Sequence, residues 1–195
     1  MKPPWDAIVI GAGAAGLMAA GVASARGRRV LVLEHTDTIG AKILISGGGR
    51  CNFTNRDVRP ERFLSENPHF ARSALARYTQ HDFIGLVSKH GIPFYEKTSG
   101  QLFCEGAGSA RRIVQLLLDE AQGAEVRTGV SVSAVTKGAL FRLETSAGPL
   151  EASSLILACG GLSIPKLGAT DFAFRLAQQF GLPIIAPRPA LVPLV

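Results

Sequence analysis

Three glycines, spaced Gly11-x-Gly13-x-x-Gly16, constrain the fold of this chain more than any other feature. An apolar run, residues 7–10, precedes them and predicts a buried strand, whereas a run of small residues follows them and predicts a helix. In such a context the first glycine permits a tight turn. The second lets the backbone approach a pyrophosphate, and the third lets helix and strand pack closely. The segment therefore predicts a strand–turn–helix unit that binds a dinucleotide.

An acidic residue after the next apolar run narrows the choice of dinucleotide. Residues 29–33 predict a second buried strand, which ends at Glu34, roughly 20 positions after the first glycine. A carboxylate there accepts hydrogen bonds from a ribose diol and repels a 2′-phosphate, so NADP is disfavoured while NAD and FAD both remain open. The small residue Ala20 and then Gly27, placed where a left-handed helix cap is expected, favour FAD.

A third apolar run supports FAD from the other end of the sequence. Residues 155–158 predict a strand, and the chain continues as Cys159-Gly160-Gly161. An apolar run followed by Ala-x-Gly is typical of FAD proteins, in which the chain returns to the sheet after a meander and passes close to the cofactor. Ala158 and Gly160 are therefore candidate cofactor contacts.

The rest of the pattern predicts a mixed α/β chain. Residues 36–55 are rich in glycine and predict a functional loop that contains a short helix. The other expected elements are helices near 70–78, 82–90, 110–122 and 172–180, a hairpin at 94–104, and a small antiparallel meander at about 125–152. Ser109 is a candidate N-cap for the third of these helices.

Composition excludes several classes of protein. The chain has 195 residues, 47% of them hydrophobic, with a net charge of +6, so it is neither disordered nor collagen-like. The basic residues are spread out, which predicts a solvated basic surface rather than a nucleic-acid interface. Three cysteines without a CxxC pair predict a reducing, cytoplasmic setting. Residues 7–25 lack charge but are mostly Ala and Gly, so neither a signal peptide nor a membrane span is expected.

A loop with three consecutive glycines, Gly47-Gly48-Gly49-Arg50, lies between Lys42 and Asn55. Backbone amides and a guanidinium in one loop suit contact with an anion. Cys51 follows without a neighbouring cysteine, so we expect it to pack beside the cofactor rather than act as a redox dithiol. His35 either flanks the adenosine or faces solvent.

The stretch Lys42-Ile-Leu-Ile-Ser-Gly-Gly-Gly-Arg-Cys-Asn-Phe-Thr-Asn55 resembles a hallmark of the BaiN-type NAD(P)/FAD-dependent oxidoreductases. These flavoproteins are often labelled aminoacetone oxidase-like and include a bile-acid Δ4,6-reductase. The resemblance also covers residues 100–104, 160–165 and 189–194. It implies a Rossmann-like FAD-binding domain of the two-dinucleotide-binding type, α/β in class, with a small antiparallel β-meander. One departure concerns residues 171–174, Asp-Phe-Ala-Phe, where the family usually keeps glycines.

The motifs and the resemblance together give a set of candidate cofactor contacts. They are Gly11, Ala12, Gly13, Ala14, Ala15, Gly16, Glu34, His35, Lys42, Gly48, Gly49, Arg50, Cys51, Asn52, Val132, Ala158 and Gly160. Val132 is expected to offer backbone groups to adenine. We assign no metal ligand and no general acid or base.

The function expected from this set is that of an FAD-dependent oxidoreductase. It would transfer hydride through flavin N5 between a small organic substrate and a nicotinamide or oxygen, with NAD(P)H a candidate electron donor. No nucleic acid or membrane partner is expected, and the oligomeric state stays open. An FAD-binding fragment without turnover is the alternative, and a tRNA-modifying flavoenzyme is a weaker one, suggested by the basic pI.

The chain stops inside an apolar run, so we expect residues 1–195 to be the N-terminal part of a split FAD-binding domain, incomplete at its C-terminus. The insertion of a substrate domain would begin at about 189–195. Expressed alone, such a chain would bind FAD weakly, because part of the cradle for the cofactor is missing.

Overall fold

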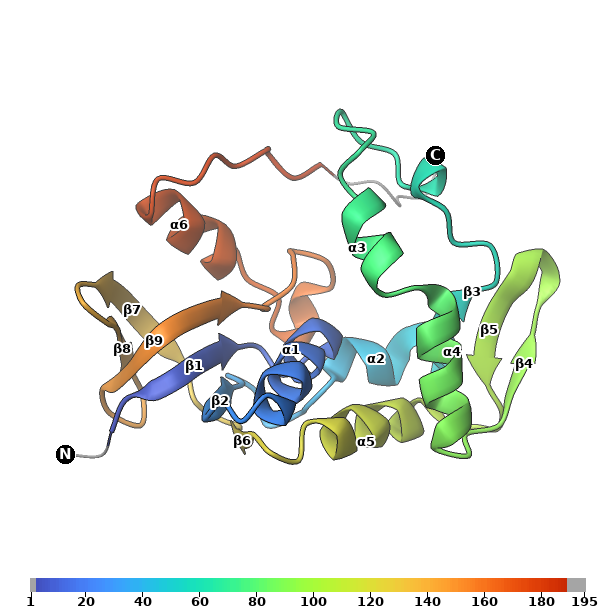
Figure 1. Cartoon of the computed structure of the whole chain (residues 1–195), viewed down its shortest axis with the longest axis horizontal. Helices are drawn as coiled ribbons and strands as arrows, with labels where there is room; N and C mark the ends of the chain where they lie inside the picture. The colour runs from blue at the N-terminus through green and yellow to red at the C-terminus, as the bar shows by residue number, and fades with distance from the viewer. Residues whose placement is uncertain (1–2, 189–195) are drawn as a thin grey trace.

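A computed structural model describes residues 3–188, which form a six-stranded sheet with helices packed on it and a smaller three-stranded sheet beside it (Figure 1). The elements are β1 (Trp5–Ile10), α1 (Ala14–Ala25), β2 (Val30–Leu33), α2 (Ala41–Ile45), β3 (Asn52–Asn55), α3 (Arg72–Arg77), α4 (Gln80–Lys89), β4 (Phe94–Glu96), β5 (Gln101–Cys104), α5 (Ala110–Glu120), β6 (Glu125–Arg127), β7 (Val132–Lys137), β8 (Phe141–Thr145), β9 (Leu150–Leu157) and α6 (Phe172–Gln179). Short 3₁₀ turns occupy Ser46–Gly48, Pro60–Arg62, Thr98–Gly100 and Pro165–Leu167.

The large sheet has the strand order β6-β2-β1-β9-β8-β7. Strands β6, β2, β1 and β9 are parallel, and β7 and β8 continue from β9 as an antiparallel meander. The parallel strands are covered on both faces, which explains why they are continuous apolar runs rather than alternating ones. Val9, Val30 and Val32 pack with α1 and α5, whereas Ile8 and Leu31 pack with the meander and α6.

The meander differs from the expectation at its start. Residues 125–127 form β6, which pairs with β2 in parallel, so the antiparallel part begins at Val132 rather than at about 125. The reason is that α5 acts as a crossover helix and returns the chain beside β2 in the same direction. The expected start of an insertion at about 189–195 lies outside the described residues.

The expected helix at 110–122 is present as α5, but its predicted cap is wrong. Ser109 already has helical backbone angles (φ −66°, ψ −15°), and its hydroxyl makes no capping hydrogen bond. An N-cap residue has extended backbone, which Ser109 does not adopt. Thr79, which was not predicted as a cap, does cap α4, in a reciprocal arrangement with Asp82.

The expected hairpin at 94–104 is confirmed as β4 and β5, and residues 52–55, expected to belong to a loop, add a third strand. Phe53 and Phe94 lie on one face of this small sheet, with 5.4 Å between ring centroids. Phe53 also lies 6.0 Å from Phe83 of α4. Aromatic packing therefore attaches the small sheet to α4.

The C-terminal ends of α4 and α5 are joined by an acid-sensitive contact. His90 Nε2 and Glu120 Oε1 lie 2.9 Å apart, and Lys89 Nζ donates to the same oxygen at 3.4 Å. The hydrogen bond from His90 is the main cause that lowers the pKa of the Glu120 carboxyl below 4.5. A lowered carboxyl pKa stabilises the fold above the unfolded value, and that stabilisation is lost as pH falls through the folded value.

We therefore expect Glu120→Gln to lower the melting temperature at pH 7, and to lower it by a smaller amount at pH 3.5. The Glu120 side chain is 35% exposed, so the decrease in the free energy of unfolding at pH 7 should stay below about 1 kcal/mol. Thermal denaturation by circular dichroism at both pH values measures the difference. Glu144→Gln, in the more exposed pair with Arg142, serves as the control. An equal loss at both pH values in Glu120→Gln would contradict this account.

Candidate cofactor site

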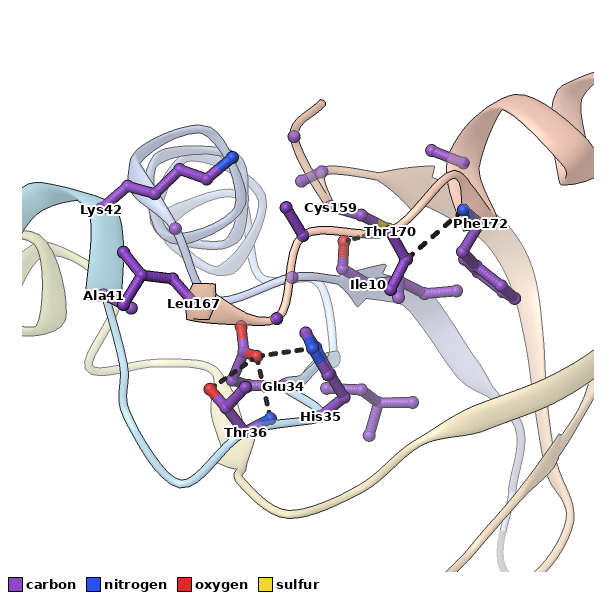
Figure 2. A pocket seen from close by; sticks show the side chains of 18 of the residues that line it. Ile10, Glu34, His35, Thr36, Ala41, Lys42, Cys159, Leu167, Thr170 and Phe172 are labelled. Carbon is purple, nitrogen blue, oxygen red and sulfur yellow. Dashed lines mark hydrogen bonds and ion pairs between the residues drawn. The ribbon is translucent and has the colours of Figure 1, made fainter. Parts of the chain in front are cut away.

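A cavity of about 730 Å³ opens at the carboxyl ends of β1, β2 and β9 (Figure 2). Ligands of open parallel sheets bind at this edge. Among the predicted contacts, those that line the cavity are Gly11, Gly13, Ala14, Ala15, Glu34, His35, Lys42, Val132, Ala158 and Gly160. The structure thus gathers residues from the glycine elbow, from both neighbouring loops and from the meander around one space.

Two glycines of the elbow are required by the protein's own packing. Gly11 has a φ of +110°, and a Cβ there would lie 2.5 Å from the carbonyl oxygen of Ala158. A Cβ at Gly16 would overlap the carbonyl oxygen of Gly11. These positions therefore serve the tight turn and the close contact between α1 and the sheet, as the motif predicts.

Gly13 has a different explanation. Its backbone angles, φ −86° and ψ −171°, are open to any residue, and a Cβ there would meet no protein atom within 4 Å. Gly13 lines the cavity, so a side chain at this position would occupy part of that space. Neither backbone conformation nor packing requires glycine here, which fits a ligand that approaches the backbone closely.

The amides at the start of α1 are available to such a ligand. The first hydrogen bond of the helix runs from Leu17 N to Gly13 O, at 3.0 Å. The amides of Ala14 and Ala15 precede it and have no acceptor within the helix. Together with the positive end of the helix dipole, they suit a pyrophosphate.

Glu34 is buried, at 9% exposure, and connects the elbow to the loop that follows β2. Its Oε2 accepts from Ala12 N at 3.0 Å, and its Oε1 accepts from the amide and the hydroxyl of Thr36, each at 3.0 Å. Ala12 therefore supports the site through Glu34 without lining the cavity. Because a carboxylate oxygen can accept two hydrogen bonds, Oε2 keeps capacity for a ribose hydroxyl.

His35 and Lys42 lie at the rim of the cavity (Figure 2). His35 Nδ1 lies 3.0 Å from Glu34 Oε1, and its side chain is 48% exposed, so it both borders the cavity and faces solvent. Lys42 Nζ donates to Gly161 O and to Ser163 Oγ, each at 3.1 Å. The lysine therefore ties α2 to the loop that follows β9.

The rest of the glycine–arginine loop does not line this cavity. Gly48 and Gly49 lie beyond α2, Asn52 begins β3, and Arg50 is exposed, with its Nη1 donating to the hydroxyl of Tyr95 at 3.0 Å. The loop was predicted to lie beside the elbow because the sequence alone does not reveal the separation that α2 introduces between them.

Other residues line the cavity without having been predicted. They are Thr36, Thr38, Ser131, Leu167, Gly168, Ala169, Thr170, Phe172 and Arg175, among others. Phe172 belongs to the segment 171–174 that departs from the family pattern, so that departure lies at the rim of the cavity. Among residues 3–188, no cluster of His, Cys, Asp and Glu is suited to hold a metal ion.

Cys51 and Cys104 are buried thiols, and Cys159 is partly buried and lines the cavity. Cys51 is 5% exposed and Cys104 is fully buried, and Cys104 N donates to the carbonyl of the residue before Cys51 at 2.9 Å. Burial raises the pKa of Cys51 and Cys159 and raises that of Cys104 to about 11. A thiol that stays protonated is a poor nucleophile, which agrees with a packing role. Cys51 does not line the cavity, so its position beside the cofactor stays a prediction.

We expect all three thiols of the folded chain to react with Ellman's reagent at pH 8 at least about tenfold more slowly than in guanidinium chloride. Release of the coloured thiolate product over time measures both rates. A thiol that reacts at the unfolded rate in the native chain would contradict the assignment of these cysteines to packing roles.

Comparison with known proteins places this site in a family. The sequence profile described as "HI0933-like protein Rossmann domain" matches residues 5–188, nearly the whole chain. The chain belongs to this family. The predicted α/β Rossmann-type fold is thereby confirmed, and among the described residues no helix is long and apolar enough to cross a membrane.

The names of two similar curated proteins state two different activities. Ribosomal RNA dihydrouridine synthase of Escherichia coli is 50% identical over 192 residues, which covers 97% of this chain and 48% of that protein. The 3-dehydro-bile acid delta(4,6)-reductase of Clostridium scindens is 34% identical over 194 residues, covering 95% and 46%. The chain thus spans about half the length of the curated relatives it matches. Its identity to the bile-acid reductase, the BaiN-type relative, is lower than its identity to the dihydrouridine synthase.

The fold itself recurs in solved structures. The crystal structure of Thermovibrio ammonificans THI4 superimposes with a TM-score of 0.55 at 14% identity, covering 92% of this chain and 64% of that one. At this identity the likeness concerns the fold of the HI0933-like domain and nothing finer.

Proposed function

We propose that this chain is the FAD-binding half of a flavin-dependent reductase that acts on uridine in ribosomal RNA. The observation that carries the FAD part is Gly13, a glycine that neither packing nor backbone requires and that borders a cavity of about 730 Å³. The substrate part is supported by the 50% identity to the dihydrouridine synthase of Escherichia coli.

The residues of the cavity suit the adenosine diphosphate end of FAD. The amides of Ala14 and Ala15 would hold the pyrophosphate, and Glu34 would accept from the ribose. Backbone groups at Val132 would border the adenine. Lys42 would keep the loop after β9 in place, as it does through Gly161 and Ser163. When bound, FAD supplies hydride transfer, and the protein supplies placement and electrostatics.

The two relatives suggest the type of reaction. Formation of dihydrouridine and reduction at delta(4,6) both add hydrogen to a carbon–carbon double bond, although one substrate is RNA and the other a small molecule. From the sequence, an RNA substrate was the weaker alternative, because the basic residues are spread along the chain. The 50% identity to the dihydrouridine synthase supports placing an RNA substrate first in this proposal. A small-molecule reductase is the second candidate, supported by the 34% relative.

The test uses the protein at the full length of its relatives, with FAD and NADH or NADPH as electron donor. It is incubated with ribosomal RNA that lacks dihydrouridine, and the nucleosides are analysed by mass spectrometry. We expect one uridine to gain two hydrogen atoms. Oxidation of the nicotinamide with a bile-acid substrate only would favour the second candidate, and no turnover with either substrate would favour a binding module without activity.

A further inference from the structure

One face of the small sheet carries aromatic rings that do not line the cofactor cavity. Tyr95 of β4 and Phe103 of β5 are opposite each other in the antiparallel ladder, so they lie on the same face. Their rings stack, with 6.0 Å between centroids and 26° between planes. Phe94 precedes Tyr95 and therefore lies on the other face, the one that packs toward α4.

Two cations accompany these rings. Lys97 Nζ lies 4.2 Å from the centroid of the Phe103 ring, and Arg50 Nη1 donates to the Tyr95 hydroxyl at 3.0 Å. Both cations are exposed, and within residues 3–188 neither makes an ion pair. We call Arg50, Tyr95, Lys97 and Phe103 the cation–aromatic face.

The acidic side chains of this region leave the face positive. Glu96 lies between Tyr95 and Lys97 along the chain, so it belongs to the opposite side of the strand, where it pairs with Arg56 at 2.9 Å. Glu105, one residue beyond β5, is exposed.

Helix α5 begins beside the same loop and adds further positive charge. Ala110 N donates to Gly49 O at 3.0 Å, which places the first turn of the helix against the glycine–arginine loop. Arg111 and Arg112, in that first turn, are exposed and make no ion pair in the part of the chain that the structure describes.

We propose that the cation–aromatic face binds the RNA substrate, with phosphates on the cations and a base against the exposed part of Tyr95. The proposal rests on the proposed function. Proteins that bind single-stranded RNA combine a basic surface with aromatic rings on which bases stack. A protein partner fits less well, because Phe103 is only 6% exposed and Tyr95 is half-buried, so the face offers much charge and little apolar area.

The test measures binding of a fluorescein-labelled 20-nucleotide single-stranded RNA to the full chain by fluorescence anisotropy between 50 and 200 mM KCl. Tyr95→Ala should weaken binding about 5- to 150-fold, the range for loss of one stacked base. Lys97→Ala should reduce the slope of log K against log salt by about 0.7. Lys137→Ala is the matched control, because Lys137 Nζ lies 5.0 Å over the Phe141 ring on the meander.

The proposal would be overturned if Lys97→Ala and Lys137→Ala changed the salt dependence of RNA binding equally. It would also be overturned if RNA binding did not depend on salt. It would also be overturned if the Tyr95 and Lys97 variants instead weakened association with the second half of a longer protein, measured by co-purification. If the wild-type protein binds RNA through this face but does not reduce uridine, the proposed activity is refuted and the proposal for the face stands. RNA binding insensitive to both variants would remove the face alone.

Discussion

Gly13→Val should abolish FAD binding while the chain stays folded. The Cβ of the new side chain would meet no protein atom within 4 Å, and the side chain would occupy space in the cavity that Gly13 lines, next to the helix amides. Because the backbone at residue 13 could no longer approach the pyrophosphate closely, the affinity for FAD should fall at least about 100-fold, a loss of about 3 kcal/mol in binding free energy. The cost to folding should stay within about 1 kcal/mol, as for the loss of a favourable N-cap residue.

Quenching of FAD fluorescence during titration measures the affinity, and thermal denaturation without cofactor measures the fold. Gly138→Val is the matched control, because Gly138 also has open space around it but lies in the turn between β7 and β8, away from the cavity. Wild-type FAD affinity in Gly13→Val would refute the assignment of the cavity to the cofactor.

Gly16→Ala should destabilise the chain by about 3 kcal/mol or more, at the upper end of overpacking effects. A Cβ at this position would overlap the carbonyl oxygen of Gly11 and would lie 3.3 Å from the Cβ of Ala158. The overlapped atom is backbone and cannot rotate away, so α1 must move off the sheet. Equilibrium unfolding in urea, without FAD, measures the loss.

A glycine-to-alanine substitution on α4 should have the opposite effect on stability. Gly85 is exposed, and a Cβ there would meet no atom within 4 Å. Gly85→Ala should therefore stabilise the chain by about 0.5–1 kcal/mol, the usual cost of glycine in a helix. If both alanine variants shifted stability in the same direction by similar amounts, close contact between α1 and β1 would not explain the third glycine of the motif.

Local signals predicted most of the fold, and long-range pairing accounts for the main error. The unit from β1 to β2 was predictable because its strands, turn and helix are consecutive. The direction of β6 was not, because residues 125–127 pair with β2, more than 90 residues earlier, and three residues carry no periodicity that distinguishes parallel from antiparallel. The cap at Ser109 failed for another reason, since a hydroxyl before a helix does not determine the backbone angles of its own residue.

The candidate site was predictable where one motif contains its residues. Gly13 and Glu34 follow from spacing alone, whereas Thr170 and Arg175 reach the cavity only because the chain returns after β9. The same limit concealed the cation–aromatic face. Tyr95 and Phe103 are eight positions apart, and Arg50 lies far from both, so only the ladder of the small sheet brings them together.

The central claim is that the glycine elbow and Glu34 bind the adenosine diphosphate end of FAD. Its most direct test is titration of the ¹⁵N-labelled chain with FAD, followed by amide NMR. The account predicts that the largest shifts occur at Ala14, Ala15 and the residues around Glu34, and that they vanish in Gly13→Val. Shifts centred elsewhere, or none at millimolar FAD, would contradict it.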